Sequence, residues 1–137
     1  MKRKATAVWN GTIKDGSGTL STQSGTLKET QYSFKSRFES GTGTNPEELI
    51  AAAHSGCFAM QLSAFLTEEN FKPEKLEAKG EVTLEDGTVT KSHIILDAKI
   101  PDIKQDKFDT LVKKAKENCP ISKLLKTEIS VEATLKN

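Results

Sequence analysis

The residue in this sequence best suited to nucleophilic or redox chemistry is Cys57, in the stretch AAAHSGCFAMQL at residues 51–62. A cysteine reacts as its thiolate, and a free thiol has a pKa of about 8.5, which burial among apolar side chains raises further. Cys57 lies in the middle of an expected helix, where the helix dipole contributes little, so a reactive thiolate needs a nearby cation. His54, one turn earlier on the same face, and Arg37, which keeps its charge, are the candidates. The alternative is that Cys57 is a small apolar residue that fills the core.

Cys119, the second of the two cysteines, follows a helical pattern and directly precedes Pro120. Proline favours the first position of a helix, so Cys119 is a candidate N-cap for a short helix that begins there, and a thiol at a helix N-terminus can be acidified. The simpler interpretation is that Cys119 closes the apolar stripe of the preceding helix, which starts at Phe108.

A zinc site is an alternative use of the same residues. Its four ligands would be His54, Cys57, His93 and Cys119. The closely spaced ligand pairs typical of zinc knuckles are missing, and His93 falls in a strand pattern that points it outward. The sequence therefore favours free thiols over a metal site.

The composition is that of an ordinary soluble protein, with one domain expected over residues 1–137. Its 20 basic and 19 acidic residues leave a net charge of +1, which provides no field to attract nucleic acid or an anionic membrane. The N-terminus is basic but has no apolar segment after it, so it does not resemble a secretory signal. We therefore expect a cytoplasmic protein, in a reducing compartment where its cysteines are free, catalytic or metal-bound.

Residues 49–66 carry no charge over nearly the length of a membrane span. The segment is rich in Ala, Ser, Gly, His and Gln, which favours a buried helix of a soluble protein. Asn45 suits the N-cap, Pro46 the first helical position and Glu48 a capping box, so we expect a helix over about residues 46–67. Because its middle is apolar nearly all round, we expect it to be buried on most sides.

Strand and turn patterns surround this helix. The first 40 residues predict Gly-punctuated hairpins and then a half-buried strand, QYSFKSRFE, with Arg37 on its polar face. After the helix we expect two strands around an Asp86-Gly87 turn, an amphipathic helix that reaches Cys119, a short helical turn, and a final alternating strand, TEISVEATLK. The order βββ-α-ββ-αα-β predicts an α+β fold with antiparallel sheet and segregated helices.

Several segments also resemble one known family. TNPEELIAAAHSGCFAM is similar to the first-cysteine helix, and KENCPISKLLKTEISVEATLK to the second-cysteine segment, of the family of osmotically inducible protein C and organic hydroperoxide resistance protein (OsmC/Ohr). The opening WNGTIKDGSGTLSTQSG and the stretch FKSRFESGTGTNPEEL resemble the osmotically inducible branch. The match spans nearly the whole chain.

The resemblance implies an intertwined homodimer of α+β subunits and a cysteine peroxidase without haem, flavin or metal. Cys57 matches the family's attacking cysteine, Cys119 its resolving cysteine, and Arg37 and Glu47 the polar pair that serves the attacking thiol. The implied substrates are organic hydroperoxides, and the implied role is oxidative and osmotic stress defence. Cys57 would be oxidised to a sulfenic acid, a Cys57–Cys119 disulfide would follow, and a small dithiol or lipoyl-type reductant would restore both thiols.

The position of Glu47 bears on the expected dimer. Glu47 precedes Cys57 by ten residues, about 15 Å along a helix, so it does not reach the thiol of its own chain. If two copies of the helix cross antiparallel near Ala52, Glu47 of one copy approaches Cys57 of the other. Glu47 would then hold Arg37 by a bidentate pair, and Arg37 would stabilise the thiolate. Taken alone, Arg37 is also explicable as a solvated cation and Glu47 as a favourable charge in the first helical turn.

The residues alone leave three points open. His54 either tunes Cys57 or hydrogen-bonds within the helix pair. Apolar side chains that could form a wall for alkyl peroxides are explicable more simply as core: Phe38, Phe58, Met60, Leu124 and Leu125. The same cysteine pair could also serve a sensor that reports peroxide to a partner without turnover.

Overall fold

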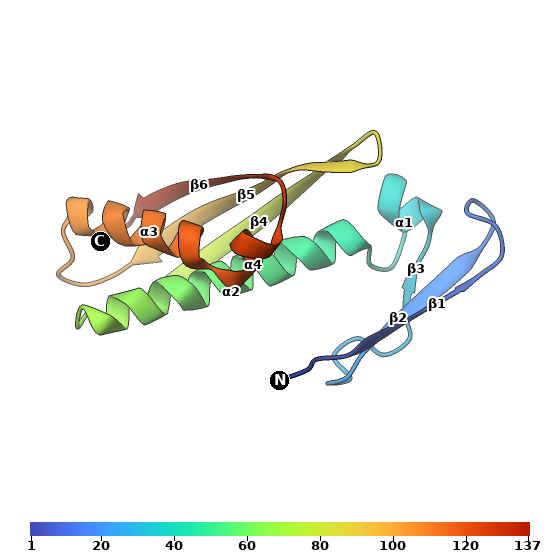
Figure 1. The fold of residues 1–137 in the computed structure, drawn as a ribbon, viewed down its shortest axis with the longest axis horizontal. Coiled ribbons are helices and arrows are strands. Elements are labelled where there is room, and N and C mark those ends of the chain that lie inside the picture. The colour runs from blue at the N-terminus through green and yellow to red at the C-terminus, as the bar shows by residue number, and fades with distance from the viewer. The chain divides into compact units, whose positions relative to one another are not determined.

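The computed structural model describes every residue, Met1–Asn137, and separates into two units, residues 1–49 and residues 50–137. The elements follow the order β1-β2-β3-α1-α2-β4-β5-α3-α4-β6, labelled in Figure 1. Each unit contains one three-stranded sheet. The helices and sheets confirm the expected α+β class, whereas the expectation of one domain over residues 1–137 stays a prediction.

The first unit is built on a sheet in the order β1-β2-β3. Its antiparallel strands are β1 (Ala5–Asn10), β2 (Ser17–Thr22) and β3 (Thr30–Tyr32). The register places Gly18 between Trp9 and Tyr32, whose ring centroids lie 5.4 Å apart. A side chain at residue 18 would collide with both rings, so this position requires glycine. The predicted hairpins are therefore confirmed, with Trp9 and Tyr32 as packing residues.

The segment after β3 corrects the sequence analysis. We expected QYSFKSRFE to form one strand, but a short helix, α1 (Phe34–Phe38), begins within it. Ser33 and Ser36 form a reciprocal capping box: the Ser36 N–H donates to Ser33 Oγ at 3.2 Å, and the Ser33 N–H donates to Ser36 Oγ at 2.8 Å. This pair satisfies backbone donors that the start of the helix leaves free.

The expected strand failed because its apolar spacing fits both structures. Phe34 and Phe38 are four residues apart, a spacing that lies on one face of a strand and also on one face of a helix. In α1 their rings pack with centroids 4.9 Å apart. Arg37 therefore projects from a helix.

The second unit contains the longer sheet, in the order β4-β5-β6. Its strands are β4 (Lys75–Glu85), β5 (Thr88–Lys99) and β6 (Glu128–Leu135). β4 and β5 pair antiparallel around the Asp86-Gly87 turn, as predicted. β6 pairs parallel with β5, which corrects the expectation of a wholly antiparallel sheet. Alternation along a strand does not encode its direction, and a parallel pair needs a long crossover, which the helices between β5 and β6 supply.

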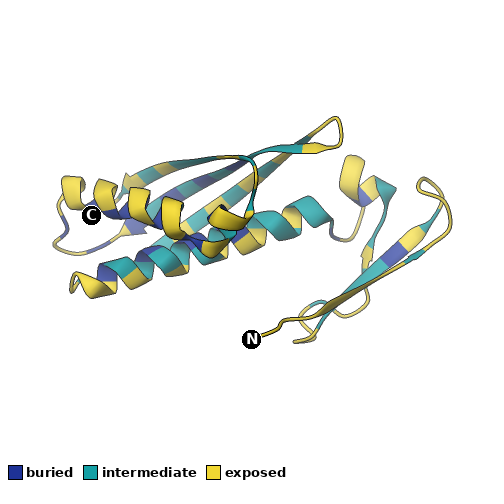
Figure 2. Ribbon diagram, viewed as in Figure 1, coloured by how far each residue is buried: buried dark blue, intermediate teal, exposed yellow.

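Helices from two parts of the chain form one core with this sheet. They are α2 (Pro46–Glu68), α3 (Gln105–Asn118) and α4 (Pro120–Leu124). The fully or nearly buried apolar side chains come mainly from α2, β5 and α3: Phe58, Leu62, Leu66, Ile94, Leu96, Ala98, Phe108, Leu111, Val112 and Ala115. Figure 2 marks these buried positions on the three elements. α2 and α3 therefore cover the face of the sheet to which alternate β5 residues point.

The N-terminus of α2 is capped largely as predicted. Asn45 Oδ1 accepts from the Glu48 N–H at 2.8 Å, which confirms Asn45 as the N-cap. The Glu48 carboxylate does not complete the expected capping box. It accepts a hydrogen bond from Thr44 Oγ1 at 2.8 Å. Glu48 is thus held to the chain that leads into α2.

Contacts within the single chain bury α2 on one side only, so the expected burial on most of its sides is not met by this chain alone and stays a prediction. His54, Phe58, Leu62 and Leu66 are buried, whereas the exposed positions in its middle are Ala52, Ala53, Gly56, Met60 and Ala64. At 100° per residue, the exposed positions fall within an arc of about 120° around the helix axis. By length and mean hydropathy, 1.5 over its most apolar window, α2 could cross a membrane, but core helices of soluble proteins share these properties, and α2 packs on a sheet.

Candidate active site

The two cysteines meet where α2 faces the junction of α3 and α4. Cys57 is half-buried in the middle of α2, and Cys119 is fully buried between the two later helices. Both are free thiols, and they lie close enough together for Cys119 to raise the pKa of Cys57. The structure therefore brings the two predicted cysteines together within residues 50–137.

The surroundings of Cys57 within this unit favour the protonated thiol. Burial, the largest cause, raises the pKa of Cys57, and the hydrogen bond to Cys119 raises it further because it stabilises the neutral form. A hydrogen bond with the backbone of Ile121 acts in the opposite direction. A reactive thiolate at Cys57 therefore needs a cation that these contacts do not supply.

Cys119 has a defined backbone position because it ends one helix and begins the next. Its N–H donates to Ala115 O at 2.9 Å at the end of α3, and its carbonyl accepts from the Lys123 N–H at 3.0 Å in α4. Pro120 occupies the first position of α4, so the prediction that Cys119 is an N-cap is confirmed. The Cys119 side chain makes no capping hydrogen bond, which leaves the sulfur free to meet Cys57.

His54 contacts neither cysteine through its ring nitrogens. It is fully buried, with Nδ1 2.6 Å from Ser92 Oγ and Nε2 2.8 Å from Ser122 Oγ. Burial lowers the pKa of His54, so the ring is neutral near pH 7. The ring therefore bonds to serines of β5 and α4, and neither a bond within the helix pair nor a contact with Cys57, the two interpretations left open by the sequence, is confirmed.

The four residues considered as zinc ligands do not form a site. His93 Nδ1 lies 2.6 Å from Ser130 Oγ on the neighbouring strand, and both nitrogens of His54 face serines. Nowhere in the chain do three or more His, Cys, Asp or Glu side chains gather as a possible metal site. The donor arrangement leaves Cys57 and Cys119 as a thiol pair.

Arg37 and Glu47 form a two-point ion pair within residues 1–49. Arg37 Nη2 donates to Glu47 Oε1 at 2.8 Å, and Arg37 Nε lies 3.2 Å and 3.3 Å from the two carboxylate oxygens. Asn45 brings them together, because it caps α2 and also donates through Nδ2 to Ser36 O in α1 at 3.0 Å. The pair implied by the family resemblance is therefore present, and its service to Cys57 stays a prediction.

An apolar groove of about 240 Å³ adjoins Arg37 in the same unit. Its lining is mostly aromatic: Trp9, Ile13, Tyr32, Ser33, Phe34, Arg37 and Phe38. Of these lining residues, only Phe38 was predicted from the sequence as a possible wall for an alkyl group. The pairing of Trp9, Gly18 and Tyr32 across three strands, which builds one side of the groove, depends on strand register and is not visible as a sequence motif.

The remaining wall candidates separate by exposure. Phe58 is fully buried and belongs to the core. Leu125 is half-buried, whereas Met60 and Leu124 are 77% and 72% exposed. Only the exposed residues are available to contact another molecule.

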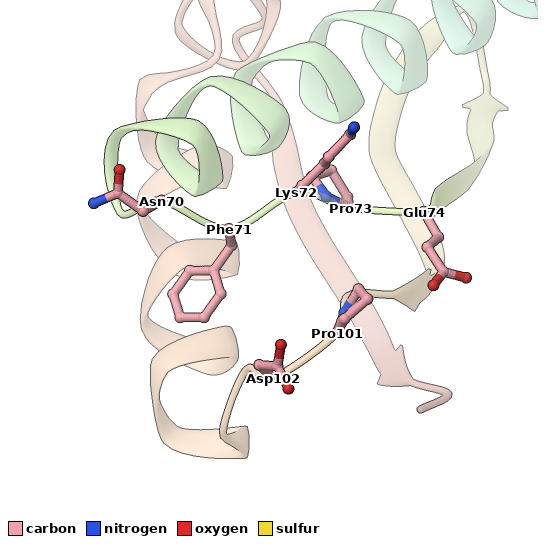
Figure 3. Close-up of a pocket in the computed structure, with 7 residues that line it drawn as sticks. All are labelled: Asn70, Phe71, Lys72, Pro73, Glu74, Pro101 and Asp102. Atoms are coloured by element: carbon pink, nitrogen blue, oxygen red, sulfur yellow. The ribbon is translucent and has the colours of Figure 1, made fainter.

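Another groove, of about 680 Å³, lies at the far end of α2 from its N-terminus (Figure 3). Asn70, Phe71, Lys72, Pro73 and Glu74 line one side of it, and Pro101 and Asp102 line the other. Cys57 lies eleven residues before the end of α2, about 16 Å along the helix axis. The groove contains no thiol and is not part of the cysteine site.

The fold and the facing thiols define an α+β protein built around a cysteine pair. Comparisons with known proteins agree: the family model described as OsmC-like protein matches residues 39–134. Peroxiredoxin OsmC of Escherichia coli K12 is 42% identical to this chain, and the alignment covers 98% of this chain and 97% of the relative. Organic hydroperoxide resistance protein OhrB of Bacillus subtilis is 35% identical over 72% of this chain and 74% of the relative. The chain belongs to the OsmC-like family, which confirms the resemblance.

Solved structures show the same fold. The crystal structure of Bacillus subtilis OhrB aligns with a TM-score of 0.68 and 28% identity, covering 97% of this chain and 98% of that chain. The OsmC-like protein of Mycoplasma pneumoniae aligns with a TM-score of 0.79 and 14% identity, covering 100% and 99%. The second similarity concerns the fold alone.

Proposed function

We propose that this protein is a thiol-dependent peroxidase that reduces organic hydroperoxides to alcohols. The observation that carries the proposal is the proximity of the two free thiols, Cys57 and Cys119, which lie close enough for Cys119 to raise the pKa of Cys57. The names of the relatives, a peroxiredoxin and an organic hydroperoxide resistance protein, support a peroxide-reducing redox protein.

The proposed reaction begins at Cys57, because this residue is only half-buried, whereas Cys119 is buried. The Cys57 thiolate attacks the distal peroxide oxygen: an S–O bond forms, the O–O bond breaks, and the alkoxide takes a proton and leaves as alcohol. The Cys119 thiol then attacks the sulfenic acid, so an S–S bond forms and the hydroxyl leaves as water. An external small dithiol or lipoyl-type reductant exchanges with this disulfide and returns both thiols.

Arg37 is the proposed cation for the thiolate, with Glu47 orienting it. The two-point ion pair fixes the guanidinium plane, which single-point pairing would not do. Each unit by which Arg37 lowers the Cys57 pKa corresponds to about 1.4 kcal/mol of preferential thiolate stabilisation. Because burial and Cys119 both raise the pKa of Cys57, the proposed role of the Arg37 cation is to lower it.

A homodimer is the proposed assembly. An apolar stripe on α2 is formed by the exposed positions Ala52, Ala53, Gly56, Met60 and Ala64, and all of them except Met60 are small, which permits close approach of a second helix. Cys57 lies at the edge of this stripe, so a second copy would shield it from water. Glu47, about 15 Å from Cys57 along its own helix, would serve the thiol of the other copy in an antiparallel crossing.

The proposed setting is the cytoplasm, where a reducing environment keeps both thiols available between turnovers. There the protein would defend against oxidative and osmotic stress. Neither nucleic acid nor a membrane has a part in the proposed function. A sensor that uses the same cysteines without turnover is the competing function, and multiple turnover separates the two.

The test combines mass spectrometry with turnover. One equivalent of tert-butyl hydroperoxide should remove two hydrogens from a single chain, and several equivalents of peroxide should be consumed per chain when a dithiol is supplied. Cys57→Ser should abolish consumption, whereas Cys119→Ser should retain the first oxidation and then accumulate sulfinic acid. Equal, mild effects of the two substitutions would contradict the assigned roles, and oxidation without turnover under several dithiols would favour the sensor.

A further inference from the structure

His54 is a buried polar residue one turn before Cys57 in α2, and it links three elements. Its ring contacts Ser92 in β5 at 2.6 Å and Ser122 in α4 at 2.8 Å. No buried side-chain nitrogen or oxygen in the chain lacks a hydrogen-bond partner. Because an unpaired polar group in the core is costly, the three side chains are satisfied only while α4 keeps its place beside α2 and β5.

The contact with Ser122 lies one turn away from the contact between the thiols. His54 precedes Cys57 by three residues, and Ser122 follows Cys119 by three residues. Residues three apart are neighbours on a helix, so α2 and α4 are joined by two adjacent links, His54–Ser122 and Cys57–Cys119. The 3.0 Å bond from the Lys123 N–H to Cys119 O closes the turn that carries Cys119, so the placement of Ser122 constrains it.

We propose that His54 is a positioning residue for disulfide formation: by binding Ser122 it holds Cys119 within reach of Cys57. This inference rests on the peroxidase function proposed above. The Cys119 thiol attacks the Cys57 sulfenic sulfur, the S–S bond forms, the S–O bond breaks, and the hydroxyl leaves with the thiol proton as water. Disulfides require a Cβ–Cβ separation of about 3.5–4.5 Å, so a displacement of α4 by about 1 Å slows the step.

The chemistry of the link suits positioning rather than proton transfer. Neither ring nitrogen of His54 faces a sulfur, because both are engaged by serine hydroxyls. A neutral imidazole has one donor and one acceptor, so one serine accepts from the ring and the other donates to it. Such a link fixes distance and direction, which apolar side chains of the same volume would not do.

The test separates the two oxidation steps by rapid quenching with tert-butyl hydroperoxide, alkylation of remaining thiols and intact mass measurement. In Ser122→Ala we expect Cys57 to be oxidised at the unaltered rate and the disulfide to form about tenfold more slowly. Sulfinic acid should then accumulate at excess peroxide. Ser122→Thr, which keeps a hydroxyl, should restore the rate.

Ser130→Ala is the matched control. It removes a second His–Ser hydrogen bond, His93 Nδ1 to Ser130 Oγ at 2.6 Å, which joins β5 to β6 and leaves α4 untouched. Disulfide formation in this variant should proceed at the unaltered rate. Equal slowing in Ser122→Ala and Ser130→Ala would overturn the proposal, because general loosening of the fold would then account for both.

A second measurement needs no peroxide. In glutathione buffers, a tenfold loss of disulfide stability in Ser122→Ala would appear as a reduction potential about 30 mV higher. Ser92→Ala, which frees the other side of the His54 ring, should shift the potential in the same direction. Unchanged potential and unchanged disulfide rate in folded Ser122→Ala would overturn the proposal. Failure of the peroxidase function would appear differently, as unreactive Cys57 in the unaltered chain.

Discussion

Arg37 Nη2 and Glu47 Oε1 lie 2.8 Å apart, although the two residues are on different helices and ten positions apart in sequence. The Arg37 side chain is 38% exposed and that of Glu47 only 13%. A partly exposed ion pair contributes about 1 kcal/mol or less to stability. The main effect of this ion pair is therefore to orient the Arg37 guanidinium, and not to stabilise the fold.

Replacing Glu47 by glutamine should impair peroxide reduction much more than folding. Glu47→Gln keeps the size of the side chain but removes the charge that holds Arg37, so we expect the rate with limiting tert-butyl hydroperoxide to fall about tenfold or more. Glu48→Gln is the matched control, because the neighbouring carboxylate binds Thr44 and not Arg37. Equal losses in the two variants would remove the Arg37–Glu47 pair from the mechanism.

The pKa of Cys57 should respond in opposite directions to two substitutions. Cys119→Ala removes the hydrogen bond that favours the neutral thiol, so the pKa of Cys57 should fall. Arg37→Ala removes the proposed cation, so the pKa should rise. The rate of Cys57 alkylation against pH, assigned to the residue by peptide mass, measures both shifts. An unchanged profile in Arg37→Ala would show that another group stabilises the thiolate.

His54 should make the protein sensitive to mild acid. Burial lowers the pKa of His54 in the folded state from its ordinary value of 6.5, so the unfolded chain binds this proton more readily. The associated stability is present above about pH 6.5 and is lost as the pH falls from there through the lower folded-state pKa. Urea unfolding from pH 7.5 to pH 5 should show this loss in the unaltered chain and a smaller one in His54→Gln. His93→Gln, which leaves His54 in place, should keep the unaltered profile.

The sequence predicted those features that depend on local patterns. The cap at Asn45, the Asp86-Gly87 turn and the helix break at Pro120 all follow from residue preferences at single positions, and the structure has each of them. The serine partners of His54 could not be predicted, because Ser92 and Ser122 lie 38 and 68 residues away in sequence and only the tertiary fold brings them to the ring.

The errors have equally specific causes. The spacing of Phe34 and Phe38 fits one face of a strand and also one face of a helix. The Ser33–Ser36 capping box stabilises the start of a helix here, and the sequence analysis did not recognise it. The direction of β6 depends on the crossover through α3 and α4 and leaves no trace in its alternating pattern. The contacts of this chain alone bury less of α2 than its sequence predicts, because apolarity shows that a surface avoids water, not which molecule covers it.

Gly56 provides the sharpest test of what covers α2. In the single chain a Cβ at this position would meet no atom within 4 Å, and replacing a helical glycine should raise helix stability by up to about 1 kcal/mol. Gly56→Leu should therefore leave the isolated chain stable. If the stripe packs closely on a second copy, the added side chain should raise the dimer dissociation constant at least tenfold, measured by sedimentation equilibrium. Thr110→Leu, which places the same leucine side chain on the exposed side of α3, is the control. An unaltered chain that is monomeric at micromolar concentration, or a Gly56→Leu dimer of undiminished affinity, would contradict packing through this stripe, since neither is compatible with helices in contact at a glycine.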